Sequence, residues 1–418
     1  MKWKDILIGY FVNSGLADVQ TGPFGTQLRA SDYVADGTPV INVRNIGYGD
    51  LRAEKVEHVA EQTTDRLSQH LLQENDIVLG RKGAVDRHLF VANEQENWMQ
   101  GSDCIRLRFN TEKILPRFAS YAFLRNEHRL WMLTQSGNKA TMASLNEGII
   151  NRITLPLPPR PTQEAIVSTL SAYDDLMENN RRRMALLEES ARLLYREWFV
   201  HLRFPGHEHA RITNGIPEGW KRKTLGSITT KIGSGATPRG GDASYQSEGI
   251  TLIRSLNVYD DRFEDSGLAF INEQQASSLD NVTVQSRDIL LNITGASVAR
   301  CCMAPDRHLP ARVNQHVVII RTDPLKADPF LVHAAINSDD RKRQLLSYAQ
   351  KGSTREALTK DMIMNFDIML PSDALMLQFG DFAKTCFLQR ENLALQNQKL
   401  RAARDLLLPK LMSGELAV

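Results

Sequence analysis

Short loops rich in glycine, amide and cationic residues are the segments of this sequence whose side chains could do recognition chemistry. Five such loops are GRKGAVDRH at 80–88, SGNKATM at 136–142, TPRGGD at 237–242, TGASVAR at 294–300 and KGSTRE at 351–356. Arg and Lys can bond guanine O6 and N7 or neutralise a phosphate, Asn and Gln can pair with adenine N6 and N7, and glycine allows close backbone approach. An exposed loop that touches no ligand has a similar composition, so no single loop is specific.

These loops, with the polar residues that follow two predicted strands, supply the candidate DNA-contacting side chains. They are Arg44, Asn45, Arg81, Lys82, Arg87, Asn138, Lys139 and Thr141 in the first half of the chain, and Arg239, Arg254, Asn257, Thr294, Ser297, Arg300, Ser353, Thr354 and Arg355 in the second.

Recognisable catalytic and metal-binding motifs are absent from the sequence. It contains no GxxxxGK[ST] phosphate loop, no HExxH and no GxSxG, and IGSGATPRGGD at 232–242 lacks the Lys-Ser/Thr ending of a phosphate loop. The four cysteines, Cys104, Cys301, Cys302 and Cys386, form no CxxC pair and have no histidines at zinc-finger spacing. We therefore predict no catalytic residue, no bound metal and no bound cofactor in this chain.

The sequence contains an internal duplication. GTPVINVRNI at 37–46 reappears as GITLIRSLNV at 249–258, and NDIVLGRKGAV at 75–85 reappears as RDILLNITGAS at 287–297, both at a shift of 212 residues. Leu157 and Pro158 match Leu370 and Pro371 at a shift of 213. A self-match at a constant shift indicates two copies of one structural unit.

Each half shows the same order of expected elements. Short β-branched runs such as DIVLG, CIRLRF, DILLNI and HVVIIR, broken by Gly, Asn and Asp, predict a mixed sheet, and the segments 116–135 and 328–350 predict helices. Prolines at 155–161 and 370–371 then precede one long helix in each half. We predict an α+β fold in which two duplicated domains are joined by two long helices.

The two long helices carry a heptad pattern. Apolar residues recur at alternating spacings of four and three, which predicts a seam that packs against another helix. Because the chain supplies two such helices, the simplest partner of each is the other, in antiparallel orientation. The predicted interface residues are Leu170, Tyr173, Met177, Met184, Leu187 and Leu194 in the first helix, and Phe379, Phe382, Leu393, Leu400 and Leu407 in the second.

The composition is that of a globular protein with little net charge. Hydrophobic residues make up 42% and charged residues 24% of the 418 residues, and 51 basic against 49 acidic residues leave a formal charge of +2. Overall charge therefore neither requires nor excludes a polyanionic partner. No apolar run approaches the roughly 18 residues that span a bilayer, and we expect a cytoplasmic protein.

These features together resemble the specificity subunits of type I restriction-modification systems. The resemblance rests on TGPFGTQL, GTPVINVRNI, IVLGRKGAV and ILLNITGAS, on QSG and QKGS, and above all on LPLPPRPTQEAIVSTLSAYDDLMENNRRRMALLEESARLLYREWFV. GIPEGWKRKTLG at 215–226 resembles the start of a second recognition domain, and LRAARDLLLPKLMSGEL resembles the family's C-terminal helix. Asp86, where a glycine is common, and Arg300 beside paired cysteines depart from the pattern.

The resemblance implies that this chain recognises DNA and that partner subunits carry out the catalysis. It implies target recognition domains at 1–157 and 205–370, spacer helices at 158–204 and 371–418, and a double-stranded DNA target read as two separated half-sites. Two modification subunits would carry S-adenosylmethionine and methylate adenine, and restriction subunits would use ATP and Mg²⁺ for translocation and cleavage. This chain would bind none of these cofactors.

Two other classes of function remain open from the residues alone. A coiled-coil scaffold that binds no nucleic acid would also use a duplication and long helices. A methyltransferase or nuclease would be an enzyme in its own right, but an adenine methylase is expected to contain an NPPY-like or DPPY-like segment, and the sequence has none.

Overall fold

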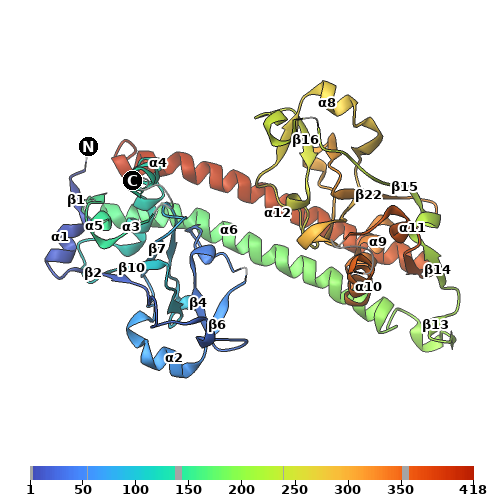
Figure 1. Cartoon of the computed structure of the whole chain (residues 1–418), viewed down its shortest axis with the longest axis horizontal. Coiled ribbons are helices and arrows are strands. Elements are labelled where there is room, and N and C mark those ends of the chain that lie inside the picture. The colour runs from blue at the N-terminus through green and yellow to red at the C-terminus, as the bar shows by residue number, and fades with distance from the viewer. Residues whose placement is uncertain (1–2, 54, 137–143, 239, 351–356) are drawn as a thin grey trace. The chain divides into compact units, whose positions relative to one another are not determined.

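The computed structural model describes residues 3–53, 55–136, 144–238, 240–350 and 357–418 (Figure 1). Contacts divide the chain into two compact units. Unit 1 comprises Met1–Glu178 and Asn397–Val418, and unit 2 comprises Asn179–Gln396. Each unit therefore contains a stretch of both long helices.

Unit 1 is built on two mixed sheets. The larger has the strand order β2-β10-β7-β8-β5 and the smaller the order β3-β6-β4-β9. The strands of the larger sheet are β2 (Ala17–Thr21), β10 (Cys104–Phe109), β7 (Ile77–Gly80), β8 (His88–Phe90) and β5 (Tyr48–Gly49), and those of the smaller are β3 (Tyr33–Val34), β6 (Glu57–Val59), β4 (Thr38–Ile41) and β9 (Met99–Gln100). The central strands β7 and β10 are buried along almost their whole length, which indicates that both faces of the larger sheet are covered.

Unit 2 repeats this topology. Its sheets have the orders β15-β22-β19-β20 and β17-β16-β21-β18. Their strands are β15 (Thr229–Ser234), β22 (Val317–Thr322), β19 (Ile289–Asn292), β20 (Cys301–Met303), β17 (Ala269–Ile271), β16 (Ile250–Ile253), β21 (Ala311–Val313) and β18 (Thr283–Val284). The parallel pair β4/β9 recurs as the parallel pair β16/β21. The duplication and the α+β class predicted from the sequence are confirmed.

Short strand pairs and helices complete each unit. The strand pairs are β1 (Asp5–Leu7) with β11 (Thr154–Pro156), β14 (Lys221–Thr224) with β23 (Asp367–Leu370), and β12 (Ile212–Thr213) with β13 (Ile216–Pro217). The helices are α1 (Ile8–Asn13), α2 (Glu61–Arg66), α3 (Pro116–Phe123), α4 (Asn126–Ser136) and α5 (Glu147–Ile150) in unit 1, and α7 (Leu225–Ile228), α8 (Glu273–Ser277), α9 (Pro329–Asn337), α10 (Asp339–Gln350) and α11 (Lys360–Met364) in unit 2. The matching helices α3 and α9 both begin with proline, which is favoured at the first helical position.

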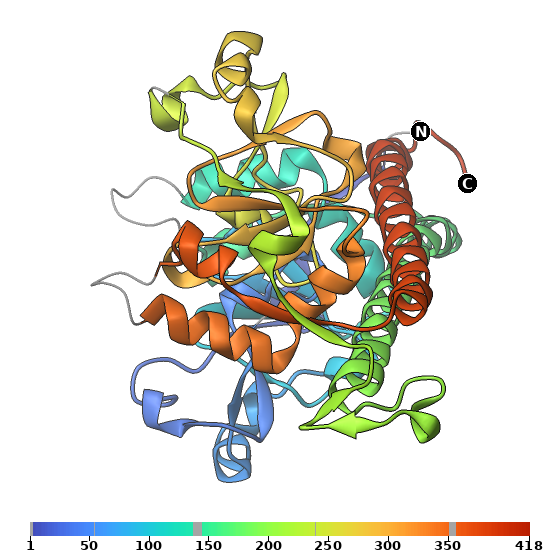
Figure 2. The same cartoon turned by 90° about the vertical axis from the view of Figure 1, so that its right-hand side faces the viewer.

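The long helices are α6 (Arg160–Tyr195), which continues into a π-helical turn at Arg196–Val200, and α12 (Asp373–Ser413). Within each unit, stretches of the two helices lie side by side (green and red in Figures 1 and 2).

Their orientation follows from contacts within each unit. In unit 1, Ile166 and Leu170 share a core with Leu408 and Leu411, and Asp174 Oδ1 lies 2.6 Å from Arg404 Nη1. In unit 2, Glu188 Oε2 lies 3.4 Å from Arg390 Nη2, and the rings of Tyr195 and Phe379 are 5.7 Å apart. Later residues of α6 meet earlier residues of α12 in both units, so the predicted antiparallel pairing is confirmed.

Most of the predicted seam residues are shielded from solvent. Leu170, Met177, Phe379 and Leu393 are buried, and Tyr173, Met184, Leu187, Leu194, Leu400 and Leu407 are half-buried. Phe382 is wrongly placed, since its side chain is 40% exposed. Buried positions continue at a spacing of four from Phe379 to Ala383, so the step of three to Phe382 points away from the core.

A buried ion pair occupies the same place in the larger sheet of each unit. Arg108 binds Asp76 through two hydrogen bonds of 2.6 and 2.7 Å, and Arg321 binds Asp288 through two of 2.7 Å. Both carboxylates are fully buried and also accept a backbone N–H, from Gln73 and from Gln285. The hydrogen bonds to Asp76 raise the pKa of Arg108. In unit 1 the pair joins the central strand β10 to the residue directly before β7. In unit 2 it joins the central strand β22 to the residue directly before β19.

No helix in the described part of the chain is both long and apolar enough to cross a membrane.

We predict that Asp76→Asn destabilises unit 1. The asparagine leaves the Arg108 charge without its counterion, and breaking one partner of a buried pair costs about 3–5 kcal/mol. Urea unfolding followed by intrinsic fluorescence measures the loss, with Asp36→Asn, at an exposed position, as control. Equal stability of the two variants would show that the pair does not contribute to the fold.

Candidate nucleic-acid interface

Loops from separate strands of unit 1 meet at one edge of its larger sheet. β10 runs antiparallel to both β2 and β7, so its first residue lies where those two strands end. The end of β4 in the smaller sheet lies at the same edge. Gly101 N donates a hydrogen bond of 2.9 Å to the carbonyl oxygen of Ile41, the last residue of β4. Residues 22–29, 42–45, 81–87 and 101–103 together form what we name edge 1.

Unit 2 has the matching arrangement. β22 runs antiparallel to β15 and β19, and Asn314 N donates to Ile253 O at the end of β16, at 3.0 Å. Residues 235–238, 254–257, 293–297 and 314–316 form edge 2. The duplication thus brings the same set of loops together twice.

Two matching glycines allow the loops to pack this closely. A Cβ atom on Gly22 would lie 2.0 Å from the carbonyl oxygen of Gly101, and one on Gly235 would lie 1.7 Å from that of Val313. Both distances are far below any van der Waals contact, so only glycine fits at the first position after β2 and β15.

Edge 1 carries cations and an aromatic ring. Lys82 Nζ lies 3.1 Å from Asp103 Oδ1, and both side chains are about half exposed. The Arg81 guanidinium lies 5.8 Å from the centre of the Phe24 ring, whose side chain is 60% exposed. Arg44 lies at the rim in an exposed ion pair with Glu57 at 2.7 Å. Such a surface suits a polyanion with stacked bases.

Edge 2 carries mostly uncharged polar groups. Thr294 Oγ1 and His316 Nδ1 are hydrogen-bonded at 2.6 Å, Gln315 Nε2 lies 3.1 Å from His316 Nε2, and Thr237 Oγ1 donates to Gln315 Oε1. Arg254 lies beside them, its guanidinium 5.0 Å from the centre of the Tyr245 ring. Ser297 is half-buried at the end of a short 3₁₀ turn.

Two of the predicted asparagines have structural roles. Asn45 and Asn257 are fully buried, and each accepts a hydrogen bond from a backbone N–H three residues earlier. Their amide groups donate to Arg52 O and to Glu264 O. Both amides brace the loop after β4 or β16, so we leave these residues out of the proposed contact surface.

Arg87, the last residue of its loop in edge 1, and Arg300, just beyond edge 2, lie against aromatic rings. The Arg87 guanidinium is 5.4 Å from the centre of the Tyr48 ring, and that of Arg300 is 4.5 Å from the centre of Tyr259. Asp86, the departure noted above, accepts hydrogen bonds of 3.0 Å from Tyr48 and Arg129. It therefore orders this aromatic cluster.

The remaining candidates, Asn138, Lys139, Thr141, Arg239, Ser353, Thr354 and Arg355, lie outside the described residues. The described chain resumes beside both edges, because Ser144 bridges to Lys82 and Ala357 bridges to Thr294.

Phe24, Asp103, Gln315 and His316 belong to the edges and were missed from the sequence. Each lies just beyond the end or before the start of a strand of the larger sheet. A comparison of strand ends between the two copies, instead of a search for glycine-rich loops, would have found them.

Comparisons with known proteins agree with this geometry. Residues 13–189 match the family model described as the type I restriction modification DNA specificity domain. The MjaIX specificity subunit of Methanocaldococcus jannaschii is 26% identical over 314 residues, covering 73% of this chain and 70% of the relative. The HindI specificity subunit of Haemophilus influenzae is 19% identical over 439 residues, covering 90% and 94%. The solved S subunit of the type I system from M. genitalium shares the fold, with a TM-score of 0.57 at 14% identity over 98% of this chain and 96% of that one.

By these comparisons the chain is similar to the specificity subunits of type I restriction-modification systems.

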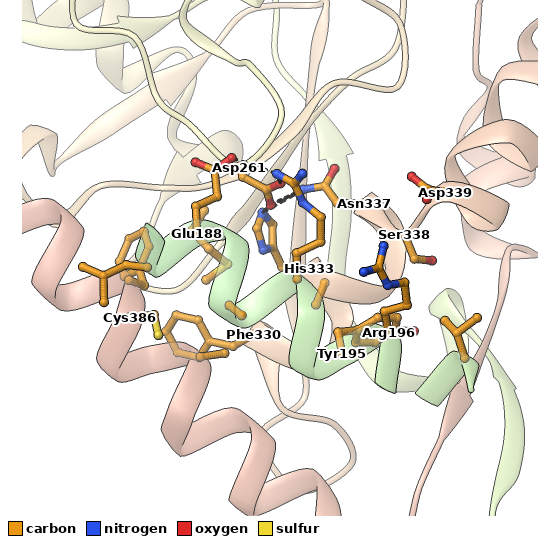
Figure 3. Close-up of a pocket in the computed structure, with 18 of the residues that line it drawn as sticks. Glu188, Tyr195, Arg196, Asp261, Phe330, His333, Asn337, Ser338, Asp339 and Cys386 are labelled. Carbon is orange, nitrogen blue, oxygen red and sulfur yellow. Dashed lines mark hydrogen bonds and ion pairs between the residues drawn. The ribbon is translucent and has the colours of Figure 1, made fainter. Parts of the chain in front are cut away.

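A hollow lies in unit 2, and its lining includes no residue of edge 2. It has a volume of about 290 Å³ and lies among the C-terminal part of α6, the N-terminal part of α12, and α9 (Figure 3). Its apolar lining includes Ala191, Phe330, Ala334 and Phe387. At one end, Glu188 and Asp261 form ion pairs with Arg192 and Arg390, and His333 Nε2 lies 3.5 Å from Asp261 Oδ1. Burial raises the pKa of Glu188 and lowers that of His333.

The matching place in unit 1 is filled. At the shift of 213 that relates α3 to α9, Ala334 matches Tyr121 and Ala191 matches Arg404. Tyr121 and Arg404 both bind Asp174, at 2.6 Å, and Arg117 binds it at 2.9 Å. The hollow in unit 2 therefore exists because alanines replace two large side chains.

The described residues include no cluster of three or more His, Cys, Asp or Glu side chains arranged to hold a metal ion.

We predict that Ala191→Leu raises the stability of unit 2. The added carbons fill the hollow with only a small loss of helix propensity, and their burial contributes up to about 2 kcal/mol. Thermal unfolding measures the change, with Ala185→Leu, on the exposed face of α6, as the matched control. A melting temperature no higher than that of the control would show that leucine does not pack in the hollow.

Proposed function

We propose that this chain selects the DNA sequence for a type I restriction-modification enzyme by reading a split site, one half-site with each unit. The observation that carries the proposal is the repeated edge. In each unit, four separate loops place side chains with base-pairing chemistry on one exposed surface. The similarity to type I specificity subunits reported above supports the same function.

The contacts divide into two kinds. Arg44 and Arg254, at the rims of edges 1 and 2, are suited to phosphates, which position the protein without reading sequence. Lys82 and Thr294, nearer the centre of each edge, are suited to base edges in the major groove. The candidate residues of the segments outside the described ranges remain part of the proposed surface.

The chemistry belongs to partner subunits in this proposal. Two modification subunits carry S-adenosylmethionine and methylate adenine, and restriction subunits use ATP and Mg²⁺ to translocate and cleave DNA. The chain itself binds none of these cofactors. The relatives named above are specificity subunits of type I restriction enzymes, which supports this division.

A scaffold that binds no nucleic acid is not favoured by any observation. It would use the helix pair but would have no need for two matching edges with unlike side chains. A gel shift of split-site DNA by the full chain with its modification subunits separates the two functions.

We predict that replacing Arg44 and Arg254 with glutamine weakens DNA binding for all sequences and reduces its salt dependence. Each lost phosphate contact lowers the slope of log affinity against log salt by about 0.9, so the pair lowers it by up to about 1.8. Fluorescence anisotropy across a salt series measures the slope. Lys113→Gln, at the opposite end of β10, is the control, and an unchanged slope in the double variant would contradict the assignment.

The helix pair is proposed to set the unread spacer between the half-sites. α6 and α12 each pass from one unit to the other, the first between Glu178 and Asn179 and the second between Gln396 and Asn397. The proposed division into recognition domains 1–157 and 205–370 and spacer helices 158–204 and 371–418 follows these helices.

Inserting one heptad at both junctions tests this role. Seven residues keep the apolar seam in phase and lengthen each helix by about 10.5 Å. We expect a spacer longer by about three base pairs with both half-sites unchanged, as measured by methylated-base sequencing of host DNA. An unaltered spacer in an active variant would rule out the helices as its determinant.

A further inference from the structure

Two side-chain pairs occupy the same position in the two edges. The strands β7 and β19 match at a shift of 212, which aligns Lys82 with Thr294, and β10 and β22 match at 213, which aligns Asp103 with His316. Backbone hydrogen bonds give the same alignment. Arg81 N donates to Asp103 O at 2.7 Å, and Ile293 N donates to His316 O at 3.0 Å.

Side chains at these two matching positions contact each other in both edges, but the chemistry of the contact differs. In edge 1 the pair is ionic, with Lys82 Nζ 3.1 Å from Asp103 Oδ1. In edge 2 the matching pair is a hydroxyl and an imidazole, with Thr294 Oγ1 2.6 Å from His316 Nδ1, and Gln315 extends it. An exposed ion pair contributes only about 0–1 kcal/mol to folding, so stability gives little reason to keep two such different pairs in one place.

The pair in edge 1 matches a G·C base pair. In the major groove, guanine presents the acceptors O6 and N7, and cytosine presents the N4 amino donor. Lys82 has only donors and Asp103 only acceptors. The ion pair therefore offers one donor and one acceptor group side by side, as the two bases of G·C require.

The group in edge 2 matches an A·T base pair. The Gln315 amide uses its oxygen to accept from Thr237 and one N–H toward His316, which leaves a second N–H and a second lone pair. Adenine presents N7 as an acceptor beside the N6 amino donor, and glutamine binds both. The half-exposed Thr294 adds a methyl group, which suits the thymine C5 methyl.

We propose that Lys82 and Asp103 read a G·C pair in one half-site, and that Gln315 with Thr294 reads an A·T pair at the matching position of the other half-site. The proposal rests on the function proposed above and adds the base class that each edge takes. Asp103 and Gln315 thereby become specificity-determining residues.

The test is a selection from random DNA duplexes by the assembled complex of the full chain with its modification subunits, followed by sequencing. Lys82→Gln and Asp103→Asn should each relax one G·C position by roughly 5- to 150-fold and leave the other half-site unchanged. Gln315→Ala should relax one A·T position by a similar factor, in the opposite half-site only. Lys113→Gln and Gln274→Ala, exposed and outside both edges, are the matched controls.

A transfer variant tests the same proposal by loss of preference. Lys82→Thr combined with Asp103→His places the edge 2 pair in edge 1. The base-pair position that Lys82 and Asp103 read should lose its preference for G·C. A melting temperature equal to that of the wild type would show that the variant keeps the fold.

The outcomes separate the two levels of the proposal. A wild-type selection that yields no pair of half-sites would overturn the proposed function itself. A split site that is unaffected by the edge variants, or that changes at an A·T position with Lys82→Gln, would overturn the base assignment alone. A split site that relaxes at G·C in one half and A·T in the other supports both.

Discussion

The antiparallel placement of one central strand between two neighbours is the constraint on which each unit depends. Because β10 begins where β2 and β7 end, loops far apart in the sequence are forced to one edge. β22 does the same with β15 and β19. The buried pairs Arg108–Asp76 and Arg321–Asp288 tie each central strand to the approach of its neighbour. A register slip would leave a buried charge unpaired, so the edge geometry is tied to the stability of the fold.

The duplication separates what the fold needs from what recognition needs. Positions that build the edge are the same in both copies, such as Gly22 and Gly235, whose neighbours leave no room for a Cβ. Side chains that point outward from the edge differ, as Lys82 differs from Thr294. The same divergence appears in the helices, where Tyr121 and Arg404 fill a space that alanines leave hollow in unit 2. Two copies of one scaffold can thus present unlike surfaces at little cost to folding.

Patterns local in sequence predicted most of the architecture. The constant shift of 212 or 213 predicted two similar units, and the heptad spacing predicted antiparallel helices. The error at Phe382 came from assuming that buried positions alternate strictly at spacings of four and three. After Phe379 the next buried position is Ala383, and Phe382 is exposed. Asn45 and Asn257 were expected to face DNA because amides read adenine, but they brace their loops from the interior. A side chain's type does not reveal whether it caps a turn or faces outward, since that depends on the path of the loop.

The sequence by itself determined the repeat, the element types and the two long helices, because apolar periodicity and duplication are properties of the chain alone. Only the tertiary structure decided which polar residues share a surface. Lys82 and Asp103 are 21 residues apart in the chain, yet their charged atoms lie 3.1 Å apart because two antiparallel strands meet at their ends. Strand pairing joins residues that are distant in sequence, and the identity of a side chain does not encode its partner across the sheet.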